Sequence, residues 1–159
     1  MSNSQIDDYD FSTGEAGASS TIPMEAGQIK KGGYIMIKGQ PCKVIDISTS
    51  KTGKHGHAKC NFTATNIFNN KKLEDIVPST HTTTVPVVSR QEYTLIDIDE
   101  EEYVSLMDDA GEIRSDIQLP TFPDDYANKI KEIFNKNEEL LVTVLKACDN
   151  EQIISYKES

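Results

Sequence analysis

The alternation of apolar and polar residues divides the chain into three segments. Residues 1–20 show no periodicity and are rich in Ser, Gly, Asp and Ala, which predicts a disordered acidic tail. From residue 28 onward, short apolar stretches alternate with turn residues. No apolar run approaches the ~18 residues that a membrane-spanning helix needs, and the N-terminus lacks the basic start and apolar core of a secretory signal. We therefore expect a cytoplasmic protein without a membrane span.

Residues 21–86 are predicted to form a small antiparallel barrel. Short strands without helical periodicity, separated by turn signals about every eight to twelve residues, are typical of such barrels. The predicted strands cover 34–38, 42–48, 59–68, 72–79 and 82–88. In the third of these strands, one face is expected to carry Cys60, Phe62, Ala64 and Phe68.

Residues 87–159 have the element order of an OB-fold, which is three strands, a helix and two strands. The pattern predicts strands over 92–99, 101–108, 111–119, 139–149 and 151–158. Helical spacing over 123–137 places apolar residues at i, i+4, i+7 and i+8, namely Tyr126, Ile130, Ile133 and Phe134. The chain is thus predicted to be mainly β, with an N-terminal barrel followed by an OB-fold that contains one α-helix.

Charge is distributed very unevenly over the 159 residues, whose formal net charge is −10. Residues 1–19 carry four acids and no base, residues 20–86 carry nine lysines against four acids, and residues 87–159 carry seven bases against eighteen acids. Such asymmetry suggests two modules that face different partners. The three widely spaced cysteines, Cys42, Cys60 and Cys148, argue for reduced, buried thiols rather than a disulfide framework.

The most unusual stretch is "STSKTGKHGHAKC", residues 48–60, which is cationic and contains no acid. It lies between two predicted strands, so it is expected to be the tip of a hairpin. Gly53 and Gly56 bracket Lys54 and His55, and glycine on both sides allows the backbone to project one side chain outward. A solvated, lysine-rich surface loop is the simplest interpretation.

The sequence of the loop argues against three further interpretations and leaves a fourth. The glycine spacing is not that of a phosphate-binding loop, and a strand follows it rather than a helix. A metal site could use His55, His57 and Cys60 with the distant His81, but the three lysines would repel a cation. A catalytic Lys54 with two histidines would lack a carboxylate to orient them and a closed pocket. Contact with a polyanion such as RNA remains, since phosphate neutralisation dominates such affinity.

The loop also carries a family resemblance. "STSKTGKHGHAK", followed by "EDIVPSTH" at 74–81 and "VP" at 85–86, closely resembles the hypusine-containing eukaryotic translation initiation factor 5A family. The resemblance extends from about residue 22 to residue 157 and includes the lead-in "KGGYIMIKGQPCKVIDIS". It implies an SH3-like barrel, followed by an OB-fold, in a translation factor that is not an enzyme.

The resemblance implies that Lys54 is the modified residue. Deoxyhypusine synthase would transfer an aminobutyl group from spermidine to Lys54, and deoxyhypusine hydroxylase would add an oxygen. No other cofactor and no metal is implied. The factor would bind the ribosome beside peptidyl-tRNA, contact rRNA and ribosomal proteins, and promote peptide-bond formation at stalling sequences such as polyproline, as well as termination. The loop residues expected to contact RNA are Lys51, Thr52, Gly53, His55, Gly56, His57 and Lys59.

The acidic second half is expected to contact basic ribosomal proteins, with tRNA only at basic spots such as Arg90 and Arg114. Tyr93 and Tyr103 are interpreted as core or sheet packing rather than as base-stacking residues. Two alternatives stay open. One is a general RNA-binding module that does not depend on the modification, and the other is an enzyme that uses Lys54 and the histidines.

Overall fold

The computed structural model describes residues 20–51, 58–136 and 138–158. The chain divides into two compact units. One unit contains the described residues up to Val87 together with Ala147–Asp149, and the other contains Val88–Lys146 and the residues from Asn150 onward. The predicted tail over 1–20 lies, except for its last residue, outside the described residues. Within the described part of the chain, no helix has the length and apolar character needed to cross a membrane.

The first unit is built from two antiparallel sheets. One has the strand order β2-β3-β4-β5 and the other pairs β1 with β6. The elements are β1 (Thr21–Glu25), η1 (Ala26–Gln28), β2 (Tyr34–Ile37), β3 (Gln40–Lys51), β4 (Ala58–Asn66), β5 (Lys72–Pro78) and β6 (Thr82–Pro86). Apolar side chains from η1, β2, β3 and β4 form its core, which includes Ile35, Ile37, Cys42, Val44, Cys60, Phe62 and Ala64.

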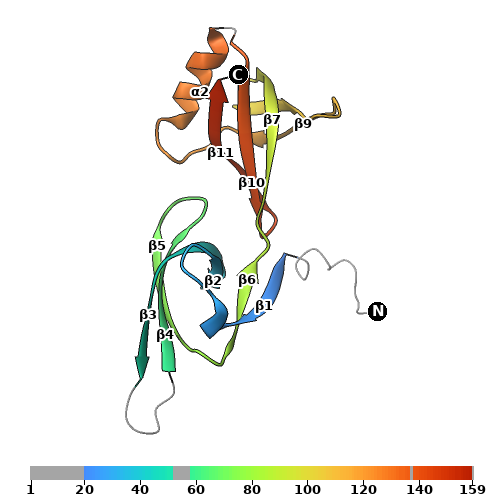
Figure 1. Ribbon diagram of the computed structural model, residues 1–159. Coiled ribbons are helices and arrows are strands. Elements are labelled where there is room, and N and C mark those ends of the chain that lie inside the picture. The colour runs from blue at the N-terminus through green and yellow to red at the C-terminus, as the bar shows by residue number, and fades with distance from the viewer. Residues whose placement is uncertain (1–19, 52–57, 137, 159) are drawn as a thin grey trace. The chain divides into compact units, whose positions relative to one another are not determined.

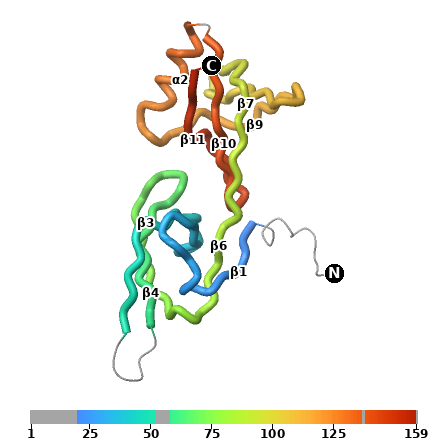
Figure 2. Tube along the Cα trace, in the orientation of Figure 1, coloured from blue at the N-terminus to red at the C-terminus, as the bar shows by residue number. Residues whose placement is uncertain are grey.

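The strand β1 was not predicted from the sequence. It pairs with β6 along its whole length, from Thr21 opposite Pro86 to Glu25 opposite Thr82, and Figure 2 shows the two strands side by side. Its burial alternates poorly, because the neighbours Ile22 and Pro23 are both exposed. Backbone pairing to β6, which periodicity cannot reveal, is therefore what places this segment in the fold.

The predicted face of the strand over 59–68 is correct except at its end. Cys60, Phe62 and Ala64 are buried, but β4 ends at Asn66, so Phe68 lies in the following turn. Asn66 takes the last inward position and is 8% exposed. Its amide nitrogen donates to Oε1 of Gln40 at 2.9 Å, and its Oδ1 accepts from the Phe68 backbone N–H at 2.7 Å. A buried amide with partners on both sides ends the strand by forming the turn itself.

The second unit is one five-stranded antiparallel sheet, in the order β11-β10-β7-β8-β9, with a single helix. Its elements are β7 (Ser89–Ile98), β8 (Tyr103–Met107), β9 (Ile113–Gln118), α2 (Tyr126–Asn135), β10 (Leu140–Ala147) and β11 (Asn150–Glu158). The helix lies against this sheet, as seen in Figure 1, with Ile130 fully buried and Ile133 and Phe134 packed on the core. This is the predicted OB-fold order, and the mainly β fold class is confirmed.

Two hairpins of this unit close with the same turn. At the first, Oδ1 of Asp99 accepts the backbone N–H groups of Glu101 and Tyr103, each at 2.9 Å. At the second, Oδ1 of Asp108 accepts those of Ala110 and Glu112, also at 2.9 Å. The fourth residue of each turn has a positive φ, 70° at Glu102 and 85° at Gly111. An aspartate that bonds its own turn fixes where each strand ends.

Candidate functional site

The hairpin of β3 and β4 supports the cationic loop. The two strands pair as far as Lys51 opposite Ala58, and Figure 1 shows them running side by side to the same end. The hairpin predicted around residues 48–60 is therefore present. Its connection over 52–57 lies outside the described residues, and this includes Thr52, Gly53, Lys54, His55, Gly56 and His57.

The last rungs of this hairpin extend beyond the core. Cys60 is the last core residue of β4 on this side, and Ser50 opposite Lys59 and Lys51 opposite Ala58 follow it. At a rise of ~3.3 Å per residue, two residues carry the ladder about 7 Å past Cys60. We call the section Ser48–Lys51 with Ala58–Asn61 the stem. It holds the ends of the loop beyond the barrel core.

Two sets of hydrogen bonds brace the stem. On one side, the amide nitrogen of Asn61 donates across the hairpin to the Ser48 carbonyl at 3.2 Å and to the Ser50 hydroxyl at 3.5 Å. On the other, the Ser79 backbone N–H donates to the carbonyl of Ala58, the first residue after the loop, at 2.9 Å. Hydrogen bonds at both edges of β4 restrict the position from which the loop starts.

Ser79 is itself anchored to η1. Its carbonyl accepts the Gly27 backbone N–H at 2.9 Å, and a Cβ on Gly27 would come within 3.1 Å of that same oxygen. The Ala26 N–H donates to the carbonyl of His81, also at 2.9 Å. The stretch "EDIVPSTH" indicates a family resemblance, but its pattern did not predict this structural role. The signal was the small residue at Gly27, which permits the close approach.

The two described lysines next to the loop lie on opposite faces of the stem. Lys59 is opposite Ser50, so it shares a face with Asn61, whereas Lys51 belongs to the alternate set that includes Thr49. Both are exposed. On the Thr49 side, a depression of about 410 Å³ is lined by Lys30, Lys31 and the carboxylate-bearing Asp46, among others. Lysines therefore lie on both faces of the stem, and two more line the depression beside it together with one aspartate.

A β-bulge lies in β3 just before the stem. Val44 pairs with Ala64 and Asp46 with Thr63, so Ile45 is an extra residue without a partner on β4. Ile45 is 42% exposed. An extra residue in one strand bends it and increases its local twist.

The cysteines are structural thiols in the described chain. All three are free, Cys42 and Cys60 are buried, and Cys148 is half-buried. Burial raises the pKa of both the Cys42 and Cys148 thiols, which lowers their reactivity at neutral pH. Cys148 was predicted to lie in a strand but lies in the turn between β10 and β11, at φ 53°. The described residues contain no group of three or more His, Cys, Asp or Glu side chains placed to hold a metal.

Arg114 is not a free cation of the second unit. Its guanidinium donates two hydrogen bonds to Asp116, at 2.8 and 2.7 Å, and two to Glu151 of β11, at 3.1 and 2.6 Å. It also donates to the hydroxyl of Tyr93 at 3.2 Å. These contacts raise the pKa of Arg114, and the Arg114 hydrogen bonds lower the pKa of Asp116. The expectation that Arg114 is available to tRNA therefore conflicts with its pairing to two carboxylates.

The Arg114 contacts also join the two edges of the sheet, since β9 and β11 are its outermost strands. The arginine lies over the ring of Tyr93, 5.8 Å from the centroid, and Tyr93 is 8% exposed. Tyr93 is thus a packing residue, as predicted. Tyr103 is 37% exposed on β8.

These two units define a class of protein, a small SH3-like domain with a projecting cationic hairpin joined to an acidic OB-fold. Residues 19–81 match the family described as "Translation initiation factor 5A-like, N-terminal". Residues 87–157 match "Eukaryotic elongation factor 5A hypusine, DNA-binding OB fold". Together the two matches cover most of the chain. The chain belongs to the translation initiation factor 5A family and is a homologue of non-enzymatic translation factors.

Individual relatives agree with this assignment. Eukaryotic translation initiation factor 5A-3 of Arabidopsis thaliana is 51% identical over 152 residues, which is 96% of each chain. Eukaryotic translation initiation factor 5A-4 of Solanum tuberosum is 54% identical over 147 residues, 92% of each chain. A solved structure of a translation initiation factor eif-5a family protein from Naegleria fowleri superposes with a TM-score of 0.82 at 48% identity. That match covers 87% of this chain and 99% of the other.

Proposed function

We propose that this chain binds the ribosome beside peptidyl-tRNA and uses a hypusine side chain on Lys54 to promote peptide-bond formation at stalling sequences and termination. The observation that supports this proposal is the braced stem, which ends in register at Lys51 and Ala58 with Lys54 in the connection. The family match over 87–157, whose description names hypusine, supports the modification. We place this activity in the cytoplasm.

The proposed chemistry begins with the modification. Deoxyhypusine synthase moves the aminobutyl group of spermidine to the Lys54 nitrogen: the carbon–nitrogen bond in spermidine breaks, a new one forms at Lys54, and diaminopropane leaves. Deoxyhypusine hydroxylase then inserts one atom of O2 into a carbon–hydrogen bond of the transferred arm, and two electrons from an external reductant carry the second oxygen atom to water. A second four-carbon arm roughly doubles the reach of the lysine without widening it. Only a thin cationic arm of this kind can enter a crowded RNA cleft and hold a tRNA end in a reactive geometry.

The flanking loop residues have a supporting role in this proposal. Lys51 and Lys59, on opposite faces of the stem, contact phosphates on either side of the loop, and Thr52, Gly53, His55, Gly56 and His57 contact RNA around Lys54. The second unit, with seven bases against eighteen acids, contacts basic ribosomal proteins over most of its interface. rRNA and tRNA contact it at few places.

Replacement of Lys54 by Arg tests the proposal. Arginine keeps the charge but cannot accept the aminobutyl group, so we expect wild-type stability and loss of output from a polyproline reporter. Lys43→Arg, at an exposed position on β3, is the matched control and should retain full output. The mass of the protein isolated from its own source should show one aminobutyl group and one oxygen on Lys54. Full reporter output from Lys54→Arg would favour an RNA-binding module that does not depend on the modification.

A further inference from the structure

Ile76 on β5 is the most exposed large apolar side chain in the described residues. Its exposed fraction is 63%, against 58% for Ile113 and 47% for Ile22. Ile45 and Ile96 have an evident reason to be exposed, since each is the extra residue of a β-bulge. Ile76 has none, because it is a regular pair partner of Asn61 in the ladder between β4 and β5.

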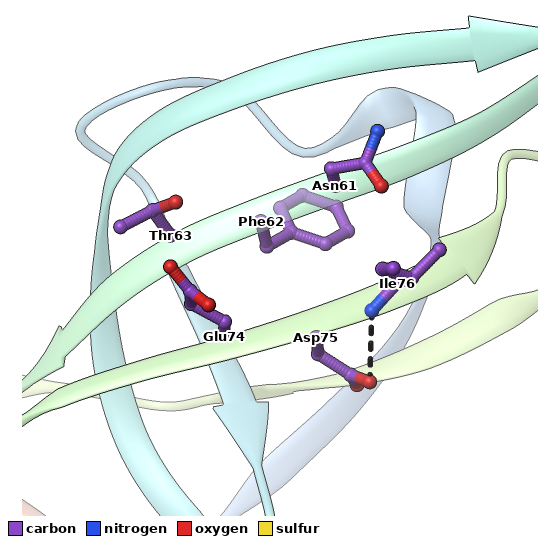
Figure 3. Close-up of a pocket in the computed structure, with 6 residues that line it drawn as sticks. All are labelled: Asn61, Phe62, Thr63, Glu74, Asp75 and Ile76. Atoms are coloured by element: carbon purple, nitrogen blue, oxygen red, sulfur yellow. Dashed lines mark hydrogen bonds between the residues drawn. The ribbon is translucent and has the colours of Figure 1, made fainter.

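Ile76 lies at a surface depression of about 520 Å³ over β4 and β5. Figure 3 shows its six lining residues: Asn61, Phe62, Thr63, Glu74, Asp75 and Ile76. Asn61 is opposite Ile76, and Thr63 is opposite Glu74. We call the surface formed by these four residues the β4–β5 face. It combines one large apolar side chain with a carboxylate two rungs away on the same face.

The β4–β5 face is acidic within a basic unit. Residues 20–86 contain four acids against nine lysines, yet two of those acids, Glu74 and Asp75, line this one depression. The third, Asp46 of β3, is the register partner of Thr63 and also lines the depression that contains Lys30 and Lys31. Lys72 approaches Glu74 only to 3.9 Å, and both side chains are about two-thirds exposed, so this ion pair is weak. A partner that presents a positive charge would meet an accessible carboxylate.

The edge of β5 is not prepared to accept another strand. The Ile76 backbone N–H is already bonded to Oδ1 of its neighbour Asp75, at 3.0 Å, as the dashed line in Figure 3 shows. A charged side chain that occupies an edge N–H discourages edge pairing. Recognition on this face therefore has to use side chains, with Ile76 as an apolar anchor and Glu74 as the charged contact.

The β4–β5 face is continuous with the stem. Asn61 is the residue that bonds Ser48 and Ser50, and it lies three residues from Ala58 at the base of the loop. Three residues of strand correspond to about 10 Å. A protein that contacts the base of the loop therefore reaches this face along the stem. An RNA that contacts Lys59 at the loop end of this face would be repelled further along it by the Glu74 carboxylate.

We propose that the β4–β5 face is the docking surface for the enzyme that attaches the aminobutyl group to Lys54. This inference rests on the proposed function. Such an enzyme has to select one lysine out of fourteen, and a contact outside the loop supplies that selection. The enzyme presents an apolar socket for Ile76, flanked by a Lys or Arg that pairs with Glu74.

The kinetics of modification test this proposal. The full-length chain, expressed without the modification, is incubated with deoxyhypusine synthase and spermidine, and the product is measured by intact mass. We expect Ile76→Ser and Glu74→Lys each to raise KM about tenfold while kcat stays within twofold of wild type, because docking precedes chemistry. Glu74→Gln should have a smaller effect in the same direction. Salt should raise KM for the wild type more than for Glu74→Lys, because it screens the attraction.

Matched controls come from the second unit. Ile113→Ser removes an Ile of similar exposure, and Glu112→Lys reverses an exposed carboxylate. Both should leave KM unchanged, and all variants should unfold at the wild-type temperature. An unchanged KM in Ile76→Ser and Glu74→Lys, with the wild type modified normally, refutes the docking surface but leaves the proposed function intact. A loss of tRNA binding in these variants without a KM effect assigns the face to RNA and also refutes it. A wild-type chain that the enzyme does not modify refutes both proposals.

Discussion

Replacement of Arg114 by Met tests whether the link between β9 and β11 stabilises the second unit. Methionine keeps an unbranched apolar stem over Tyr93 but removes the guanidinium that bonds Asp116, Glu151 and Tyr93. The Asp116 side chain is 65% exposed, so losing its ion pair with Arg114 lowers the free energy of unfolding by only about 0.5 kcal/mol. The Glu151 and Arg114 side chains are 24% and 26% exposed, and hydrogen bonds to a charged group in such a setting contribute about 1.5–3 kcal/mol.

We therefore expect Arg114→Met to lower the free energy of unfolding of this unit by about 2–3 kcal/mol, or roughly 10–20 °C in Tm for a unit of this size. The measurement is hydrogen exchange of the β9 and β11 amides in the full chain, since two units need not unfold together. Lys129→Met is the control, because it breaks an exposed pair with Asp125 and should cause no measurable loss. An Arg114→Met protein as stable as Lys129→Met would show that the two edges do not depend on this link.

The same link has a dependence on pH. The Asp116 pKa lies below its ordinary value of 3.8 because Arg114 donates hydrogen bonds to the ionised carboxylate. A lowered pKa in the folded state gives stability that is present above pH 3.8 and is lost as pH falls through the folded-state pKa. The small difference in stability between wild type and Asp116→Asn should therefore be present at pH 7 and absent at pH values below the folded-state pKa. A difference that persists there would exclude ionisation of Asp116 as its cause.

Two further predictions concern turns. Gly39 lies at φ 77° in the two-residue turn between Ile37 and Gln40, and no atom lies within 4 Å of the position that a Cβ would take. Gly39→Ala should therefore lower the free energy of unfolding by about 1–2 kcal/mol through backbone strain alone. Hydrogen exchange of the β2 and β3 amides measures this loss. Gly39→Asn is the comparison, because asparagine tolerates positive φ better than alanine, and equal losses would contradict the strain argument. Asp108→Ala removes both side-chain bonds of its turn and should cost about 1–2 kcal/mol by denaturant unfolding, while Asp109→Ala next to it should cost little.

Hydrophobic periodicity and turn residues predicted most of the helices and strands from the sequence. Each element that they failed to predict has an identifiable physical cause. The helix was predicted because Tyr126, Ile130 and Phe134 repeat at helical spacing on one face. The strand β1 was missed because its place depends on backbone pairing with β6, a segment about 60 residues away, and not on its own alternation. Ile45 interrupts an otherwise regular alternation because it is inserted in a bulge, which single-sequence periodicity cannot locate.

The candidate site was predictable only where its residues are neighbours in the sequence. The cationic loop is continuous in sequence, so composition and glycine spacing identified it together with its flanking strands. The brace at its base joins Ala58 to Ser79 and Gly27, three positions that are distant in sequence and carry no charge. The pairing of Arg114 also escaped prediction, because Glu151 reaches it only across the edges of the folded sheet.

The bulge at Ile45 separates the direction of the stem from the orientation of its side chains, two properties that are coupled in a regular strand. Deleting Ile45 would leave Val44, Asp46 and Ile47 alternating between the two faces as before, so every side chain of the stem would keep its orientation toward core or solvent. Only the bend and twist contributed by the extra residue would be lost. The direction of the stem beyond the barrel core therefore depends on a single backbone insertion that alters no stem residue. Among homologous chains, the direction of the stem could then change while the residues of the loop stay the same.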